Sequence, residues 1–224
     1  MFTLSRARSD SAKEARRADI LHQTLMLWQT HRYEDVTLQA VAGRVGLTKP
    51  ALYGYFPTKE TLFLALYEEL VGAWLRDLTR HVRLGGRHTP ASLAALICTL
   101  LAEHAALTRL IPHLAGLLER NISQERAHAH KVWLLEQLQP LAPLLETALP
   151  GLPPGTSLQL LTYTQALVAG LYPMSDPAPA VRAALQAPEL APLCVEFGPV
   201  LQEALTALYA GMSSLGSTAP DHEP

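Results

Sequence analysis

The 224-residue chain lacks the features that mark several large classes of protein. Its only two cysteines, Cys98 and Cys194, are far apart and form no CxxC pair, which argues against a disulfide scaffold or a structural zinc site and suits a reducing cytoplasm. No apolar run approaches the roughly 18 residues of a transmembrane helix, and the amino terminus has no apolar secretory core. We therefore expect a cytoplasmic protein with no membrane partner.

Strand patterns and enzyme motifs are missing as well. Period-two alternation of apolar and polar residues is absent over any useful length, while leucine and alanine dominate almost every segment, which predicts an all-α protein. Apolar residues make up 49% of the chain, so it can bury a sizeable core and is not disordered. Because there is no GxGxxG, GxxxxGK, GxSxG or HExxH motif, we expect no catalysis, no cofactor and no metal.

Charge is distributed unevenly along the chain. Residues 1–60 carry nine Lys and Arg against six Asp and Glu, a net charge of +3, whereas the remaining residues carry a net charge of −5. A basic amino-terminal segment on an acidic body indicates a polyanionic partner for that segment only. The phosphates of nucleic acid are the obvious candidate.

Apolar periodicity and capping residues predict a series of helices. Thr37, Thr48 and Thr58 stand at N-cap positions, and Thr89-Pro90 opens a later helix. Residues 1–9 are expected to form a loose arm. The helices are expected at about residues 10–31, 38–45, 49–55, 59–82, 90–106, 107–119 with an interruption near Pro112, 122–138, 157–172, 180–187 and 193–212.

The segment 37–60 has the dimensions of a helix-turn-helix. Two helices of about two turns each are joined by Gly46-Leu47-Thr48, and glycine suits a tight turn that needs a left-handed residue. The second helix is expected to present Lys49 and Tyr53 outward, as does a helix that enters the major groove of DNA. The apolar positions expected to face inward are Val41, Val45, Leu47, Leu52 and Phe56.

Other residues of the same segment can hold phosphates beside the groove, because hydroxyls, cations and helix N-termini bind anions. The positions expected to contact bases or phosphates are Thr37, Gln39, Arg44, Thr48, Lys49, Pro50, Ala51, Tyr53, Tyr55 and Lys59. The alternative is that these short helices only pack together as a core and bind nothing. That alternative does not explain why two tyrosines, on either side of Gly54, are expected to face outward.

These residues resemble the TetR family of bacterial transcriptional regulators. The resemblance rests on Gly46-Leu47-Thr48, Leu52-Tyr53, Tyr55-Phe56, Thr58-Lys59-Glu60 and Leu62, with Ile20-Leu21, Thr37 and Val41-Ala42 upstream. It implies a homodimer that binds double-stranded DNA, with a homeodomain-like three-helix domain followed by a C-terminal helical bundle. In such proteins a small molecule bound in the bundle usually releases the DNA.

The resemblance and the helix pattern together predict the domain limits. We expect an N-terminal DNA-binding domain over residues 1–56, with the helix-turn-helix at about 38–55, and a C-terminal ligand-binding and dimerisation domain over 57–216. A disordered tail is expected over 217–224. One departure from the family is Arg32, which stands where glycine usually precedes an aromatic residue; a left-handed backbone there would cost about 1–2 kcal/mol.

The last two long helices, 157–172 and 193–212, are apolar on more than one face. Burial on two sides fits a symmetric four-helix interface to which each of two chains gives both helices. In the alternative, both helices are buried within a single chain. The positions expected at the dimer interface are Leu161, Leu167, Val168, Phe197, Val200, Leu201, Ala204 and Leu208.

An effector pocket is expected inside the C-terminal bundle, and the apolar composition favours a mostly apolar ligand. The candidate lining residues are Trp74, Cys98, His104, His113, Trp133, Tyr163 and Tyr172. Each of these residue types is also common as ordinary core or surface, so none identifies the pocket by itself.

Two functions therefore remain open from the sequence. The first is a regulator, by family default a repressor, that reads a near-palindromic operator and is released by an unidentified small molecule. The second is a helix-turn-helix DNA-binding dimer without an effector, which acts as a structural or division-linked factor. A helical enzyme is the remaining alternative, and the absence of catalytic motifs argues against it.

Overall fold

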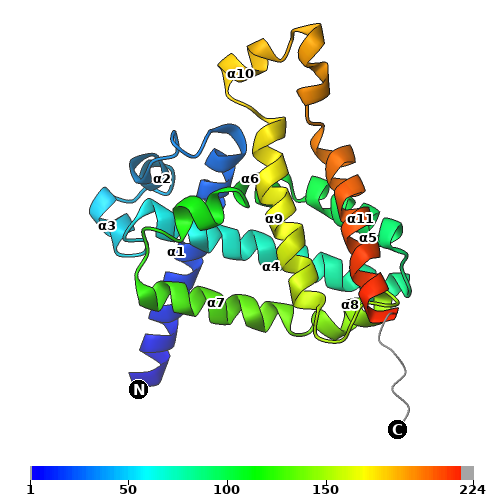
Figure 1. Ribbon diagram of the computed structural model, residues 1–224. Coiled ribbons are helices and arrows are strands. Elements are labelled where there is room, and N and C mark those ends of the chain that lie inside the picture. Colours follow the sequence, from blue (N-terminus) through cyan, green and yellow to red (C-terminus); the bar gives the residue numbers. More distant parts are fainter. Residues whose placement is uncertain (1, 218–224) are drawn as a thin grey trace. The chain divides into compact units, whose positions relative to one another are not determined.

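The computed structural model describes the backbone of residues 2–217 and the side chains of residues 11–215, and every regular element within them is helical (Figure 1). The elements are α1 (Phe2–Thr30), α2 (Leu38–Arg44), α3 (Lys49–Tyr53), α4 (Lys59–Gly85), α5 (Pro90–Glu103), α6 (Ala105–Leu110), the π-helix η1 (Leu114–Leu118), α7 (Gln124–Leu138), α8 (Ala142–Ala148), α9 (Ser157–Ser175), α10 (Pro179–Ala184), the 3₁₀-helix η2 (Pro188–Leu193) and α11 (Phe197–Ser217). The all-α fold predicted from the sequence is confirmed. None of the described helices is both long and apolar enough to span a membrane.

The chain forms two compact units. Unit one comprises the described residues up to Glu69 together with Leu114–Ala127, and unit two comprises Leu70–His113 together with the described residues from His128 onward. α4 and α7 each contribute one part to unit one and the other part to unit two. The segment 114–127 therefore belongs with the amino-terminal helices, although the chain reaches it only after α5 and α6.

Unit one is built around α1 and the first half of α4. Ile20 and Trp28 of α1 are buried, and the Trp28 ring meets the Phe63 ring edge-on at 5.7 Å between centroids. Leu52 of α3 is fully buried, which fixes the short helix on this core. A buried apolar side chain contributes about 1.5–3 kcal/mol, so a five-residue helix is held by tertiary packing and not by its own propensity.

Capping residues set the starts of the short helices as the sequence predicts. The Thr37 hydroxyl accepts the Ala40 backbone N–H at 3.1 Å, and the Thr48 hydroxyl accepts that of Ala51 at 3.4 Å. Gly46 has a φ of +67° between the two helices, a conformation that only glycine adopts at no steric cost. The predicted left-handed turn is confirmed.

Several helix limits differ from the sequence pattern. α1 is helical from Phe2, so the backbone of the expected loose arm continues the helix. His104, with φ −97° and ψ 46°, separates α5 from α6, two residues before the boundary expected after residue 106. α11 begins at Phe197 because Pro188–Leu193 forms the separate 3₁₀-helix η2. Pro173 lies within the last turn of α9, which reaches Ser175.

Arg32 does not carry the expected strain. No described non-glycine residue has a positive φ, so the backbone at Arg32 is not left-handed and the cost that such a backbone would carry does not arise. The chain instead leaves α1 through a turn in which the Asp35 N–H donates to the Arg32 carbonyl at 3.1 Å. The tail predicted for residues 217–224 lies, apart from Ser217, outside the described residues.

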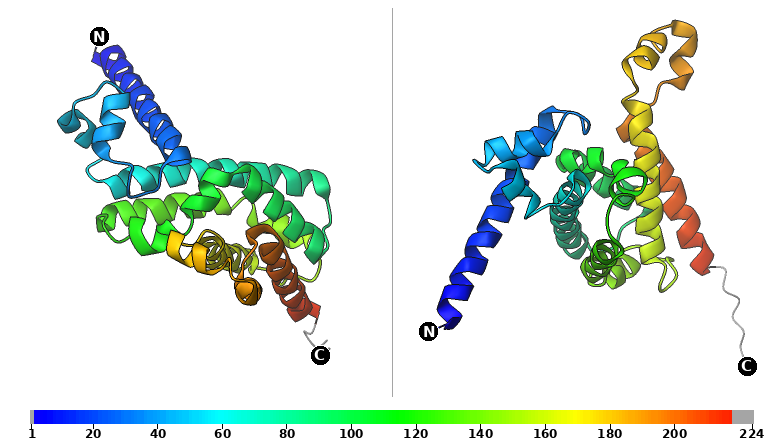
Figure 2. Two further views of the ribbon diagram at one scale, coloured as in Figure 1. Left: turned by 90° about the horizontal axis from the view of Figure 1, so that it is seen from above. Right: turned by 90° about the vertical axis from the view of Figure 1, so that its left-hand side faces the viewer.

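Unit two is organised around α11, which packs beside α5 and α9 (Figures 1 and 2). Tyr209 of α11 is fully buried, and its hydroxyl lies 2.7 Å from the hydroxyl of Thr164 on α9. Gly151 has a φ of +84°, and a side chain there would meet the Ser213 carbonyl at 2.6 Å. Glycine at this position lets the loop before α9 pack directly on the α11 backbone.

Candidate DNA-binding surface

α3 presents one face to the core and the opposite face to solvent. Leu52 and Phe56 are buried, whereas Lys49 and Ala51 are exposed, and Tyr53 is 41% exposed. The Lys49 ammonium lies 5.8 Å from the centroid of the Tyr53 ring, close enough for a cation–π contact. The outward cation and aromatic ring predicted for the second helix are therefore present on one surface.

The remaining predicted positions lie on α2 and α3 or within a few residues of their ends. We call the ten positions the α2–α3 surface. Eight of them are exposed and two, Tyr55 and Lys59, are half-buried; the exposed members are Thr37, Gln39, Arg44, Thr48, Lys49, Pro50, Ala51 and Tyr53. Thr37 and Thr48 also use their hydroxyls as N-caps, so these hydroxyls stand beside the backbone N–H groups that open α2 and α3.

Lys59, the first residue of α4, is turned partly toward the protein. Its ammonium donates to the Tyr33 carbonyl and, at 3.4 Å, to the Glu34 carbonyl, and it lies 3.9 Å from the centroid of the Tyr33 ring. Partial burial lowers the pKa of Lys59. The side chain expected to reach a phosphate therefore also fixes the loop between α1 and α2.

Two arginines of α1 support the α2–α3 surface and were missed by the sequence analysis. Arg16 donates to the Val45 carbonyl at the end of α2, at 3.3 Å, where a cation also favours the helix dipole. The Arg17 guanidinium lies 4.7 Å from the centroid of the Phe56 ring. The sequence analysis gave neither residue a role, and only the packing of α1 shows these contacts.

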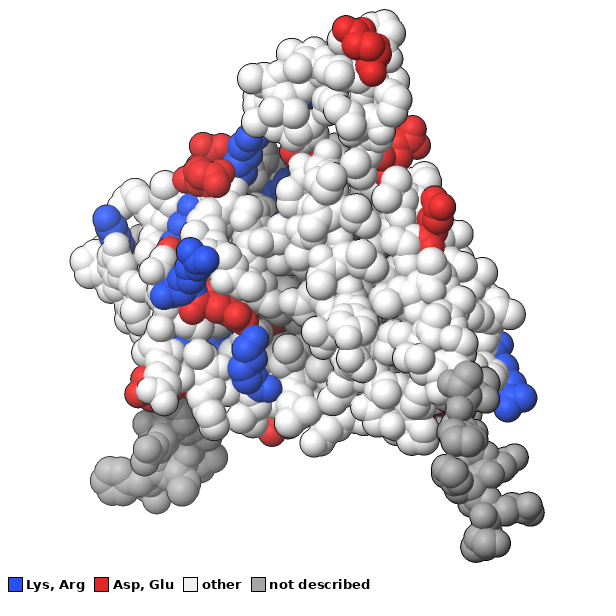
Figure 3. All heavy atoms as spheres, in the orientation of Figure 1, with Lys and Arg blue, Asp and Glu red and all other residues white. Residues whose placement is uncertain are grey.

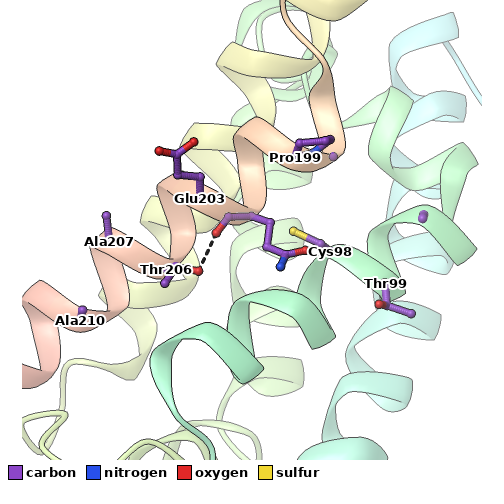
Figure 4. A pocket seen from close by; sticks show the side chains of 10 residues that line it. Cys98, Thr99, Pro199, Glu203, Thr206, Ala207 and Ala210 are labelled. Atoms are coloured by element: carbon purple, nitrogen blue, oxygen red, sulfur yellow. Dashed lines mark hydrogen bonds between the residues drawn. The ribbon is translucent and has the colours of Figure 1, made fainter.

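The predicted effector residues are scattered within unit two. Trp74 is 8% exposed, and its indole N–H has no hydrogen-bond partner among the described residues. The Trp133 ring packs over the backbone of Gly72, and His104 pairs with Asp77 at 2.9 Å. Cys98 lines an open surface groove between α5 and α11 (Figure 4), and Tyr163 is 40% exposed.

His113 and Tyr172, the other two candidates, are half-buried. The Tyr172 ring meets the Phe197 ring edge-on at 5.1 Å. The described residues contain no group of three or more His, Cys, Asp or Glu placed to hold a metal ion. Whether any of the seven residues contacts an effector stays a prediction.

The predicted interface residues fall into two groups. Leu161, Val168 and Leu201 are buried within the single chain, so their side chains support unit two from inside and do not lie on the outer surface. Half-buried positions can still be covered by a second copy; they are Leu167, Phe197, Val200, Ala204 and Leu208.

The outer faces of α9 and α11 are almost free of charge. α9 contains no Lys, Arg, Asp or Glu, and Glu203 is the only such residue of α11. Figure 3 shows this region as a broad white surface. The exposed positions of these two helices are mostly small or polar, among them Thr162, Ala166, Gly170, Ala207 and Ala210, but Tyr163, Met174 and Leu215 are exposed as well.

Comparison with known families agrees with this arrangement. Residues 20–66 match the family described as bacterial regulatory proteins, tetR family, and residues 68–215 match the tetracyclin repressor-like C-terminal domain. The chain belongs to the TetR family. The first match covers the helix-turn-helix and the start of α4, and the second covers the rest of the described helices through most of α11.

Two solved TetR-family structures share the fold. A transcriptional regulator of the TetR/AcrR family from Thermobifida fusca YX-ER1 superposes with a TM-score of 0.50 at 19% identity, covering 87% of this chain and 96% of the other. A tetR family transcription regulator from Shewanella sp. PV-4 has a TM-score of 0.50 at 14% identity, covering 87% and 95%. At such identities the likeness shows the TetR fold alone.

Curated relatives include nucleoid occlusion factors named SlmA. The protein of Pasteurella multocida strain Pm70 is 29% identical over 119 residues, which are 52% of this chain and 59% of that protein. The protein of Escherichia coli strain K12/DH10B is 28% identical over 124 residues, which are 54% of this chain and 62% of that protein. The chain thus spans about three fifths of the length of these relatives.

Proposed function

We propose that this TetR-family DNA-binding regulator is a homodimeric repressor that reads a near-palindromic operator through two copies of the α2–α3 surface. The observation that carries this proposal is the outward pair of Lys49 and Tyr53 on a short helix whose other face is buried. A lysine and an aromatic ring at the start of such a helix can reach base edges in the major groove.

The operator contacts are proposed to combine base reading with phosphate binding. Arg44 is exposed at the end of α2, and Thr37 opens the same helix, so both can reach the backbone beside the groove. Lys59 adds positive charge at the start of α4 even though its ammonium is shared with the Tyr33 carbonyl. Phosphate contacts fix the register, and α3 supplies the specificity.

The domain limits are part of the proposal. Residues 1–56 are proposed to bind DNA, and residues 57–216 to dimerise and to take up the effector. The uncharged faces of α9 and α11 support self-pairing, because each chain offers two helices to a symmetric bundle.

A mostly apolar effector is proposed to act through α4. This helix carries residues of both units, so a ligand that favours one placement of α4 changes the spacing of the two recognition helices. The α2–α3 surfaces of the two chains can then no longer bind both half-sites of the operator at once. Such a ligand acts only through its different affinity for the two states.

Selection from a random pool of duplex DNA, followed by titration with the chosen sequence, tests the proposal. Lys49→Ala and Tyr53→Ala should each weaken binding at least tenfold, since a base contact is worth about 1–3 kcal/mol. Lys131→Ala, which removes an exposed lysine of α7, is the control. Normal binding by both α3 variants, or no enriched sequence for the wild type, would show that the surface is misassigned.

A second candidate function is a DNA-binding dimer without an effector. The name of the curated relatives, nucleoid occlusion factor, favours it. The Trp74 indole N–H, which has no hydrogen-bond partner among the described residues, favours a pocket. A thermal-shift screen with apolar compounds separates the two, because a ligand bound by the folded state raises the melting temperature. No shift with any compound class favours the effector-free dimer.

A further inference from the structure

The excess positive charge of the amino-terminal segment is confined to the first part of α1. Residues 2–17 carry five Lys and Arg against two Asp and Glu, a net charge of +3, whereas residues 18–60 carry four of each and are neutral. The neutral part contains the whole helix-turn-helix, and one of its four cations, Lys59, already donates to the Tyr33 carbonyl. The positive charge that attracts phosphates therefore lies mainly outside the α2–α3 surface.

This part of α1 extends beyond the core of unit one. The first buried residue among the described side chains is Ile20, and every side chain from Ser11 to Arg16 is exposed. The backbone is nevertheless helical from Phe2, and at 1.5 Å per residue the stretch before the core covers about 25 Å. Figure 2 shows it running past α2 and α3 and projecting beyond them. We call residues 2–17 the α1 extension.

Two arginines fix the α1 extension beside the helix-turn-helix. Arg16 donates to the carbonyl of Val45, directly after α2, at 3.3 Å, and the Arg17 guanidinium lies 4.7 Å from the centroid of the Phe56 ring, just after α3. Lys13 stands three and four residues before these arginines, so it belongs to the same face of α1 one turn farther out, and it is exposed. The extension is therefore held in a fixed direction close to the α2–α3 surface.

The helical form limits how the α1 extension can meet DNA. An α-helix with its side chains is about 10–12 Å wide, so it does not fit into the minor groove of B-DNA, which is about 6 Å wide. In the proposed function, α3 already occupies the major groove of each half-site. The sugar–phosphate strands beside that groove remain, and cations contact them without reading the base sequence.

We propose that the α1 extension binds the phosphate backbone of the DNA that flanks each half-site, through the cations Arg6, Arg8 and Lys13. The inference rests on the proposed function and adds a second contact surface to it. This surface supplies affinity and lengthens the bound stretch of DNA, while α3 supplies the sequence preference. A helical stretch without buried side chains has little stability of its own, and contact with phosphates stabilises it.

Two duplexes that contain the same selected operator test the proposal. One duplex ends at the last base pair that the selection requires, and the other continues at each end for about ten base pairs of arbitrary sequence, which at 3.4 Å per base pair exceeds the length of the extension. The wild-type chain should bind the longer duplex at least tenfold more tightly at low salt. The triple variant Arg6→Gln, Arg8→Gln and Lys13→Gln should bind both duplexes equally.

A matched control separates local contacts from net charge. Arg76→Gln with Arg83→Gln and Arg87→Gln removes the same number of charges from exposed arginines of unit two. This control should keep the wild-type preference for the longer duplex. A loss of preference equal to that of the triple variant would show that only net charge matters, which overturns the assignment to the α1 extension.

A further variant tests the helical form itself. Ala12→Pro keeps every cation of the α1 extension but breaks the helix, because proline lacks the backbone N–H and clashes with the preceding turn. It should reduce the preference for the longer duplex at least threefold, and an unchanged preference would mean that a flexible arm suffices, which overturns binding as a helix. Exchange of the flanking sequence should change affinity less than twofold; a tenfold change would show base reading and overturn the phosphate assignment.

The remaining outcomes distinguish this inference from the function on which it rests. Equal binding of both duplexes by the wild type, or a preference that the triple variant retains, overturns the inference while the operator and the α2–α3 surface stand. If no duplex sequence is selected at all, the proposed function itself fails. The changed residues of α1 precede its first buried residue, Ile20, so thermal melts followed by circular dichroism should show an intact core in each variant.

Discussion

Gly46 and Gly43 are two glycines three residues apart with opposite backbone requirements. Gly46 joins α2 to α3 with a φ of +67°, whereas Gly43 lies inside α2 with open space where a side chain would stand. The turn between the two short helices determines how the α2–α3 surface is presented. The two positions therefore form a matched pair for testing backbone strain at this turn.

We expect Gly46→Ala to lower the free energy of unfolding by about 1–2 kcal/mol, because an L-residue is strained in the left-handed region. Gly43→Ala should leave stability unchanged or raise it by up to about 1 kcal/mol, since glycine is unfavourable in a helix. Urea denaturation followed by circular dichroism measures both. Equal effects of the two substitutions would contradict a special role for Gly46.

The carboxylate of Asp77 connects α4 to the break between α5 and α6. Its Oδ2 lies 2.9 Å from the Nε2 of His104, and Arg80 pairs with its other oxygen at 2.9 Å. The hydrogen bond from His104, assisted by the charge of Arg80, lowers the pKa of Asp77. A carboxyl whose pKa is lower in the folded protein stabilises the fold above the ordinary carboxyl pKa.

Asp77→Asn should therefore lower the melting temperature at pH 7, and the difference from the wild type should shrink as the pH falls below about 4. Thermal melts at a series of pH values test this. Glu103→Gln, which changes an exposed carboxylate one residue before His104, is the control. If Asp77→Asn lowers the melting temperature by the same amount at pH 7 and at pH 3, the cause is steric and not the charge of the carboxylate.

Among whole elements, α7 and α4 are joined within unit one by a largely buried ion pair. Arg126 Nη2 lies 2.7 Å from Glu68 Oε2, with side chains 25% and 16% exposed. The pair fixes the segment 114–127 to the helix that follows the DNA-binding residues. A change in the C-terminal bundle that moves this segment would act on the amino-terminal unit by a second route besides α4.

We expect Glu68→Gln or Arg126→Gln to lower the free energy of unfolding by about 1–3 kcal/mol, because each leaves a charged partner poorly paired. The double variant should lose less than the sum of the two single losses. Arg120→Gln, an exposed arginine in the same segment, is the control. Strict additivity in urea denaturation would mean that the two side chains do not stabilise each other.

At the level of the whole molecule, charge is divided between a basic amino-terminal part and an acidic remainder. DNA binding should therefore weaken as salt is raised, with a slope of log K against log salt of about −3.5 to −5.5 if each of the two DNA-binding units of a dimer makes two or three phosphate contacts. Arg44→Ala should make this slope shallower by about two, one contact for each copy. Arg83→Ala, at the end of α4 in unit two, should leave it unchanged.

The success of sequence reasoning differs between elements for physical reasons. α2 and α3 were predicted nearly to the residue, because Thr37, Thr48 and Gly46 act through local hydrogen bonds and backbone conformation. The boundary between α5 and α6 was predicted two residues too late, since the break at His104 is stabilised by Asp77 from another helix. Leu201 and Val168 were placed at an interface because a helix pattern shows apolarity but not which neighbour covers it.

By itself, the sequence determined the helical class, the positions of the caps and the turn, and the outward cation and tyrosine of α3, all of which depend on residues within a few positions of one another. Only the tertiary structure decided that Arg16 supports the end of α2, that Lys59 is partly buried against Tyr33, and that the segment 176–196 between α9 and α11 projects from the rest of unit two. These features depend on which distant segments the packing brings together.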